Sequence, residues 1–376
     1  MTENFATKPA VWALIFDRYP VDFASIESRE SHWTGGLTST VQEGSESSFD
    51  QLDLESTCFE QFLLQDVRSS IPADAVFGGE LAFVKLAEAM TVAGQTASLV
   101  SLTADRASVA EHAEINATES SMRRCRLAWN SVASLDFRNL DQANSAVGGS
   151  LNVDQAFSAS LVWMEARTLS AENSATAAKQ ILDFVFSRLQ SYSMQEEKCP
   201  VLMVTFRCGN DLIVRKPLNS GVAENRMHVP LWIRPNAGHA CRIQALSGSF
   251  DFLSTIAVFL GSAAASHEAS PMAVAQIADL SERVVAALQP LSSEPRSLAF
   301  LCGAPQVCPD RLLKLCGDGW KAARTEGFLL VINEGECDSS EEPSFHLFVK
   351  PEDRFNINDV SGTYATAADA LARLIN

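Results

Sequence analysis

The sequence has few cations for its size. Lysine and arginine together number 29, against 46 aspartates and glutamates, so the formal net charge at pH 7 is −17. A nucleic-acid backbone or an anionic membrane surface would repel such a chain. No basic stretch with interleaved aromatic residues is present either. We therefore expect no nucleic-acid partner, and the acidic charge is expected to keep the protein in solution.

Long hydrophobic runs are also missing. No stretch approaches the eighteen or more consecutive apolar residues that a membrane-spanning helix needs. The first twenty residues, MTENFATKPAVWALIFDRYP, lack the basic start, the long apolar centre and the small-residue cleavage site of a signal peptide. The sequence thus predicts neither a membrane span nor a secretory leader.

Cysteines do not occur in close pairs, although the chain has nine of them. Cys302, Cys308 and Cys316 form the tightest group, but zinc sites usually contain C-x-x-C pairs, and no histidine lies near these three. An odd, scattered set is typical of reduced thiols in a cytoplasm-like compartment. We interpret the cysteines as small buried hydrophobic residues and predict a cytoplasmic location.

What the sequence does contain is enough apolar material for a large core. Of its 376 residues, 47% are hydrophobic and 20% charged, as in a globular protein with one large α/β domain or two ordinary ones. Apolar runs predict buried strands, and residues spaced three or four apart predict helices. The predicted strands are 11–16, 97–102, the centre of 156–166, 201–206 and 229–233, and the predicted helices are 48–64, 80–92, 171–192, a segment ending at Gly261, and 272–289.

The predicted secondary structure changes after Pro295. The segments SLAFLCG, GFLLVI and SFHLFV predict short strands, and ATAADALARLI predicts a closing helix. Strands that alternate with helices favour a doubly wound sheet, whereas successive short strands favour a small antiparallel unit. We predict an α/β domain over 8–295 and a C-terminal subdomain over 296–376, with 105–150 unassigned.

One long segment, HVPLWIRPNAGHACRIQALSGSFDFLSTIAVFLG (228–261), resembles the sulfatase family of the alkaline-phosphatase-like superfamily. In sulfatases this region is a V-P-L-x-I-R strand, a glycine loop and a D-L-x-P-T-L-L-x-L-L-G helix. GWKAARTEGFLLVI and HLFVKPEDRFNINDV are similar to the family's C-terminal hairpin and following turn, and SFDQLDLESTCFEQF to its early helix. The matching residues in the long segment are Val229, Pro230, Leu231, Arg234, Arg242, Asp251, Thr255 and Gly261.

The resemblance implies a mixed, doubly wound sheet with helices on both faces and a small C-terminal sheet with a helix. It also implies a site where carboxylates after the first strand and after a later strand hold a divalent cation, usually calcium. The family's nucleophile is a formylglycine made from a Cys or Ser in a C/S-x-P-x-R motif. In this sequence Asp17 follows the first strand, and Ser70, Pro72 and Asp74 occupy the nucleophile motif.

Most of the remaining site positions depart from the family. Arg18 replaces the second aspartate, and Arg207 and Cys208 replace the Asp and His of the later metal motif. Lys216 lies a few residues short of the expected sulfate-binding lysine, and the acid Asp74 replaces the motif's arginine. We therefore expect only vestigial catalytic positions at Asp17, Ser70 and Lys216, and no bound metal.

Three interpretations follow. The first is a catalytically inactive sulfatase-like protein that acts as a scaffold, partner subunit or binding module, with a protein partner or a second copy of itself. The second is anion binding without turnover, through Arg18 and Arg207; the alternative for these arginines is pairing with a carboxylate such as Asp17 or Asp22. The third is residual sulfate or phosphate ester hydrolysis, which alone would call for calcium.

Overall fold

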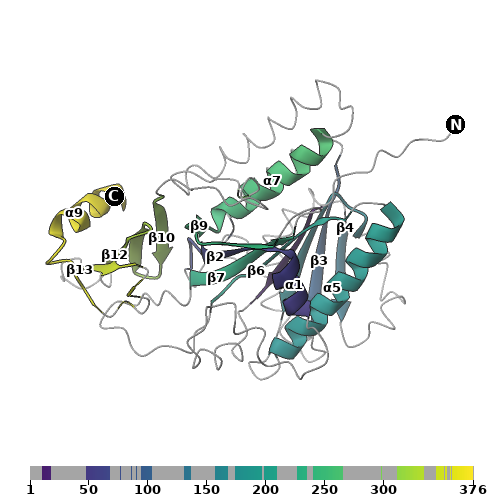
Figure 1. Cartoon of the computed structure of the whole chain (residues 1–376), viewed down its shortest axis with the longest axis horizontal. Coiled ribbons are helices and arrows are strands. Elements are labelled where there is room, and N and C mark those ends of the chain that lie inside the picture. The colour runs from purple at the N-terminus through teal and green to yellow at the C-terminus, as the bar shows by residue number, and fades with distance from the viewer. Residues whose placement is uncertain are drawn as a thin grey trace.

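A computed structural model of the chain is shown in Figure 1. Its described residues form a large sheet, a small sheet and four helices. The structure describes residues 11–17, 48–67, 77, 86, 90, 95–103, 131–136, 157–167, 174–196, 199–209, 227–234, 240–265, 298, 311–333, 344–350, 352–353, 356 and 358–375.

The large sheet has nine strands in the order β4-β3-β5-β1-β6-β7-β2-β8, with β9 also paired to β2. Strand β7 is antiparallel to both of its neighbours, and the other pairs are parallel. The sheet is therefore mixed, with five adjacent parallel strands, of which β5, β1 and β6 lie towards its centre. The strands are β1 (Val11–Phe16), β2 (Thr57–Leu63), β3 (Ala97–Thr103), β4 (Ser131–Asp136), β5 (Leu161–Arg167), β6 (Val201–Phe206), β7 (His228–Arg234), β8 (Cys241–Ile243) and β9 (Ser247–Gly248).

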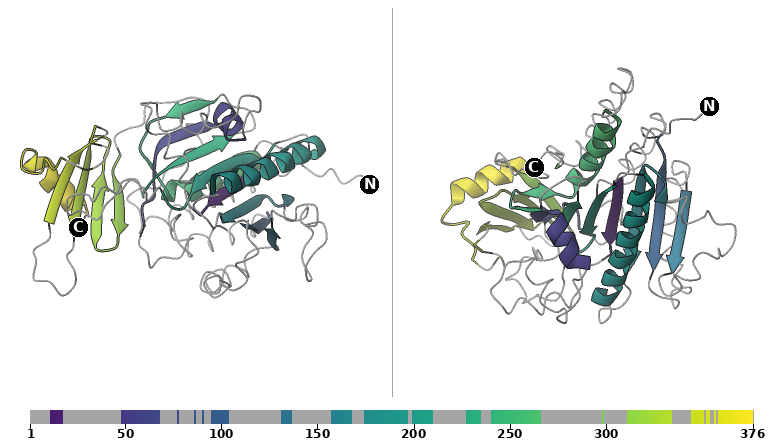
Figure 2. Two further views of the ribbon diagram at one scale, coloured as in Figure 1. Left: turned by 90° about the horizontal axis from the view of Figure 1, so that it is seen from below. Right: turned by 45° about the vertical axis from the view of Figure 1, so that its right-hand side comes forward.

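Helices cover both faces of this sheet. On one face, Trp12 of β1 packs against Tyr192 of α5 (Ser174–Glu196), with ring centroids 5.8 Å apart. The right-hand view of Figure 2 shows α5 running in nearly the same direction as the neighbouring strands, and α1 (Ser48–Glu55) contacts α5. On the opposite face, Trp163 of β5 packs against Phe252 of α7 (Phe250–Ala265). The arrangement confirms the predicted doubly wound fold.

A separate antiparallel sheet lies at the left-hand end of Figure 1. One of its faces is covered by α9 (Ala365–Ile375), where Leu330 and Leu347 pack with Leu371. Leu329 and Val331 face the other way and join a cluster that reaches Leu63 of the large sheet. The strands of the small sheet are β10 (Leu313–Gly317), β11 (Trp320–Arg324), β12 (Phe328–Asn333) and β13 (Ser344–Val349).

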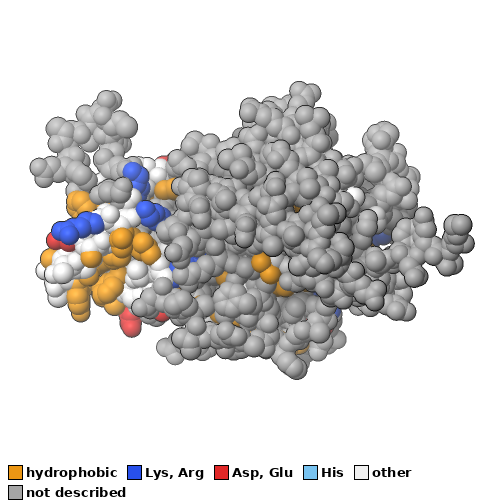
Figure 3. Space-filling model, turned by 90° about the horizontal axis from the view of Figure 1, so that it is seen from above, with side chains coloured by type: hydrophobic (Ala, Val, Ile, Leu, Met, Phe, Trp, Pro, Cys, Tyr) orange, Lys and Arg blue, Asp and Glu red, His pale blue; other side chains and the backbone are white. Residues whose placement is uncertain are grey.

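Hydrophobic side chains remain exposed in this C-terminal region. Figure 3 shows a group of them at its left-hand end, among the described side chains of that face. Phe345, Tyr364 and Leu374 are 45%, 47% and 51% exposed. Among the helices that can be followed, none has both the length and the apolar character needed to cross a membrane.

Several predicted elements are confirmed, and two are corrected. Strands were correctly predicted at β1, β3, β5, β6 and β7, as were α5 and the closing helix. The helix predicted over 48–64 is wrong, because it is α1 followed by strand β2. Helix α7 does not end at Gly261 but continues to Ala265. The unassigned region 105–150 contributes β4. The helix predicted over 272–289 and the strand SLAFLCG lie outside the described residues, Leu298 excepted.

Candidate functional site

The candidate site lies where the three central parallel strands end. The backbone N–H of Asp17 donates to the carbonyl of Ala166 at 2.9 Å, and that of Arg207 donates to the carbonyl of Phe16 at 2.8 Å. These bonds extend the ladders of β1 with β5 and β6 by one residue. Because β1 lies between its two parallel neighbours, the ends of all three strands meet at one edge of the sheet, where ligands bind in folds of this class.

Arg207 does form an ion pair there, with Glu165 of β5. Its Nη2 lies 3.3 Å from Oε2 of Glu165, and the two side chains are 15% and 6% exposed. Glu165 and Thr205 both pair with Ile15 in the strand register, so their side chains lie on the same face of the sheet. Arg207 follows Thr205 by two residues and lies on that face as well, because side chains alternate along a strand. The pair therefore reaches across β1 and joins its two neighbouring strands.

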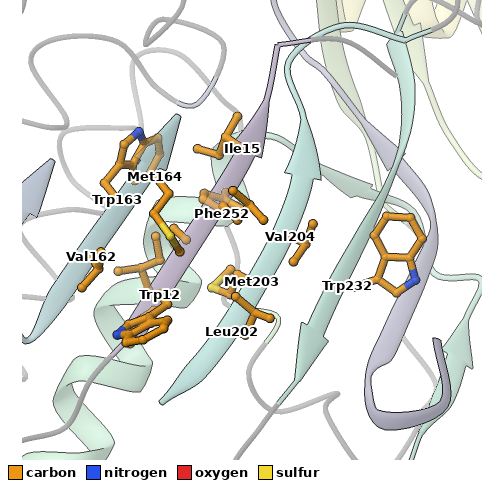
Figure 4. Close-up of a cluster of buried hydrophobic side chains, with 14 of the residues drawn as sticks. Trp12, Ile15, Val162, Trp163, Met164, Leu202, Met203, Val204, Trp232 and Phe252 are labelled. Carbon is orange, nitrogen blue, oxygen red and sulfur yellow. The ribbon is translucent and has the colours of Figure 1, made fainter. Parts of the chain in front are cut away.

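The Glu165 carboxylate has a second partner on its own strand. The indole Nε1 of Trp163 donates to Oε1 of Glu165 at 3.4 Å. The two oxygens thus have different partners, a guanidinium on one side and an indole on the other. A carboxylate this far from solvent needs such partners, because burial penalises its charge. Figure 4 shows Trp163 and Phe252 among the buried hydrophobic side chains of the core.

Arg207 itself is less completely satisfied. Its Nε is buried and, within the described part of the chain, has no hydrogen-bond partner. Nearly all buried polar groups in native proteins have a partner, so an orphan N–H calls for an explanation. A guanidinium N–H that has no protein partner can donate a hydrogen bond to an anion or to another ligand with an acceptor atom.

The sequence-predicted site residues are only partly placed by the structure. Asp17, Arg207 and Cys208 lie together at the strand ends, each with a partly buried side chain, and Asp17 and Cys208 also make contacts of their own. Arg18 and Ser70 lie outside the described residues, as does Lys216.

Glu165 was not among the predicted site residues. It is a carboxylate that pairs with Arg207, while Asp22, one of the two carboxylates suggested as a partner, lies outside the described residues. The sequence contained one signal for it, a single acid in the otherwise apolar run LVWMEA. An acid inside a strand that is buried on both faces requires a cationic or hydrogen-bonding partner.

These residues do not fit a calcium ion. Over the ranges that the structure describes, no three His, Cys, Asp or Glu side chains are grouped closely enough to hold a metal. Calcium binds six to eight oxygen ligands. Here one oxygen of Glu165 is engaged with Arg207, whose positive charge would repel a divalent cation at the same place.

Comparison with known proteins gives structural matches alone. No protein-family model and no curated protein sequence matches the chain. A solved structure from a Bacteroides thetaiotaomicron locus for glycosaminoglycan metabolism aligns with a TM-score of 0.58 at 11% identity, over 97% of this chain and 94% of that one. The phosphonate monoester hydrolase of Silicibacter pomeroyi aligns with a TM-score of 0.55 at 13% identity, over 98% and 94%.

A member of the alkaline phosphatase superfamily from Vibrio parahaemolyticus aligns with a TM-score of 0.55 at 12% identity, over 97% of this chain and 88% of that one. The chain has the sulfatase and alkaline-phosphatase fold. The alignments span nearly the whole length of both partners, so the small C-terminal sheet belongs to this sulfatase-like architecture as much as the large sheet does.

Proposed function

We propose that this protein is a catalytically inactive member of the sulfatase-like fold, which acts as a scaffold, a partner subunit or a binding module. The observation that carries the proposal is the ion pair between Arg207 and Glu165 at the ends of the central strands. A partner protein or a second copy of the chain is the proposed ligand, and the scattered cysteines support a cytoplasmic location.

The physical argument concerns charge. A metal-dependent esterase needs a cation that polarises the ester and lowers the pKa of its nucleophile. Arg207 already supplies a positive charge at this edge, and it cannot be deprotonated to serve as a base. A guanidinium can hold an anionic group, yet it generates no nucleophile. The site as described therefore supports binding better than it supports hydrolysis.

An assay with a panel of sulfate, phosphate and phosphonate monoesters tests the proposal. We expect purified protein to release no product above the buffer rate, with 1 mM calcium chloride or with a chelator. Residual hydrolysis, the alternative, predicts calcium-dependent turnover that Asp17→Ala abolishes. Asp183→Ala is the matched control, since Asp183 is an exposed carboxylate of α5 that pairs with Lys179 on the same helix. Turnover lost in the first variant and kept in the second would refute inactivity.

A second candidate function is anion binding without turnover, which the orphan Nε of Arg207 favours. We expect sulfate to raise the melting temperature above that in chloride of equal ionic strength. Sulfate at tenfold its Kd would stabilise the folded state by about 1.4 kcal/mol. Arg207→Gln should remove the effect, whereas Arg242→Gln, which alters an exposed arginine paired with Asp53 and Glu60, should not. Equal shifts in both variants would show a general salt effect.

A further inference from the structure

A second arginine–carboxylate pair lies at the start of helix α7. Arg311 binds Asp251 through two parallel contacts, Nη2 to Oδ1 at 2.5 Å and Nη1 to Oδ2. The Asp251 side chain is fully buried and that of Arg311 is 7% exposed. The backbone N–H of Gly248 also donates to Oδ2 of Asp251 at 2.8 Å. A bidentate pair with a further donor has a single well-defined geometry.

This pair connects two parts of the fold. Arg311 lies two residues before β10 of the small sheet, and Asp251 is the second residue of α7. Gln65 adds to the connection, because its Oε1 accepts from the N–H of Phe250 at 3.2 Å while its Nε2 donates to the carbonyl of Lys314 at 3.5 Å. The small sheet is thus attached by side-chain bonds to the beginning of α7, the helix that covers one face of the large sheet.

From α7 a continuous series of contacts leads to the candidate site. Phe252 follows Asp251 in the helix, and its ring meets Trp163 edge-on with centroids 5.8 Å apart and planes at 87°. The Trp163 indole donates to Glu165, which in turn holds Arg207. Phe252 is completely buried and Trp163 is 2% exposed, so neither ring has room to move independently. Figure 4 shows the two rings together beside Ile15 of β1.

We infer that Arg311 is a positioning residue for the strand-end site, and that its bond to Asp251 couples the small sheet to the Glu165–Arg207 pair through Phe252 and Trp163. A close-packed interior transmits a displacement at one side chain to the next, because no void absorbs it. Loss of the Arg311 contacts would let the first turn of α7 shift, and the Trp163 indole would shift with it. The inference concerns geometry and holds whether or not the site is catalytic.

The Trp163 indole N–H provides a direct measurement. The chain has six tryptophans, so an ¹⁵N–¹H spectrum contains six indole signals, and Trp163→Phe identifies the relevant one. We expect Arg311→Gln to move this signal and to speed its hydrogen exchange at least tenfold. Arg311→Lys, which keeps the charge, should restore part of the protection.

The matched control is Arg324→Gln. Arg324 is a buried arginine of β11 that bonds to the carbonyls of Thr325 and Glu326, so its loss should perturb the small sheet while the Arg311–Asp251 pair stays intact. Trp12, on the opposite face of the sheet, is the internal reference for general destabilisation. Equal effects of the two variants on Trp163, or equal acceleration at Trp12 and Trp163, would overturn the inference.

An unmutated sample tests the same coupling if the variants do not fold. Under low concentrations of guanidinium, we expect the Trp163 indole to exchange with the same denaturant dependence as the amides of β10 and β11. Exchange of β10 and β11 while the Trp163 indole stays protected until global unfolding would show that the small sheet opens independently, and the proposed coupling would be wrong.

Discussion

The two mostly buried arginine–carboxylate pairs of this protein are built differently. Arg311 and Asp251 meet through two parallel contacts, and a backbone N–H and a carbonyl complete their hydrogen bonding. Arg207 and Glu165 meet through one contact of 3.3 Å, and the Nε of Arg207 has no partner in the described part of the chain. One pair is complete, and the other retains an unused donor.

The difference indicates different roles. A buried ion pair whose polar atoms are all hydrogen-bonded holds its two side chains in one arrangement. Removing one partner leaves the other charge buried and uncompensated. A pair with an unused donor stabilises less and is suited to receive a ligand. The Arg311–Asp251 pair connects the segment before β10 to the first turn of α7, and it holds these two segments in a fixed position. The incomplete pair lies at the carboxyl ends of parallel strands, where ligands bind in open α/β sheets.

The largest expected effect is a difference in how much each pair contributes to the free energy of unfolding. Asp251→Ala should lower the free energy of unfolding by about 3–5 kcal/mol, because it strands a buried guanidinium. Glu165→Gln should cost roughly 1–2 kcal/mol, since it removes the negative charge of the ion pair and leaves Arg207, which is 15% exposed, partly solvated. Urea unfolding followed by circular dichroism measures both values under identical conditions.

The control for this comparison is Asp183→Ala. Asp183 pairs with Lys179 one turn away on α5, and both side chains are nearly half exposed. Exposed pairs of this kind contribute about 0.5 kcal/mol or less. Equal losses for Asp251→Ala and Glu165→Gln would mean that the orphan donor of Arg207 has no energetic meaning, and the two pairs would then have to be treated as one class.

The strands of the large sheet that are regular and buried on both faces could be predicted from the sequence, whereas the irregular strand β2 could not. Runs such as VLMVTF are buried on both faces, and they have the composition of central parallel strands. Strand β2 differs because its register with β7 shifts between Phe59 and Phe62. The irregularity leaves both phenylalanines buried three residues apart. That spacing imitates one face of a helix, and it explains the wrong prediction over 48–64.

The placement of Arg207 directly after a buried strand could be predicted from the sequence, but the partner of its ion pair could not. The end of β6 marks Arg207 from sequence alone, because polar residues follow an apolar run. Its partner Glu165 lies two strands away, across β1. Periodicity along a chain specifies which residues are buried, whereas the order of strands in a sheet depends on how their helices pack. Family resemblance supplied the fold, but it offered no counterpart for this ion pair.

A third pair, His346 with Asp359 in the small sheet, extends the comparison to a more exposed setting. Partial burial alone would raise the pKa of Asp359, but hydrogen bonds from the N–H groups of Ser361 and Leu347 and from His346 outweigh it, and the folded-state pKa is lowered. A depressed carboxyl pKa adds stability above the unfolded pKa, about 3.9, and this stability is lost as the pH falls through the folded pKa.

Asp359→Asn should therefore have a smaller effect than Asp251→Ala or Glu165→Gln, about 0.5 kcal/mol at pH 7, because both side chains are partly solvated. Thermal melts from pH 7 down to pH 2.5 measure it. The wild-type and variant curves should stay apart down to about pH 4, and they should converge below that as Asp359 is protonated in the folded state. A difference in melting temperature that stays constant through the acid range would mean that Asp359 contributes by packing and that its charge does not stabilise the fold.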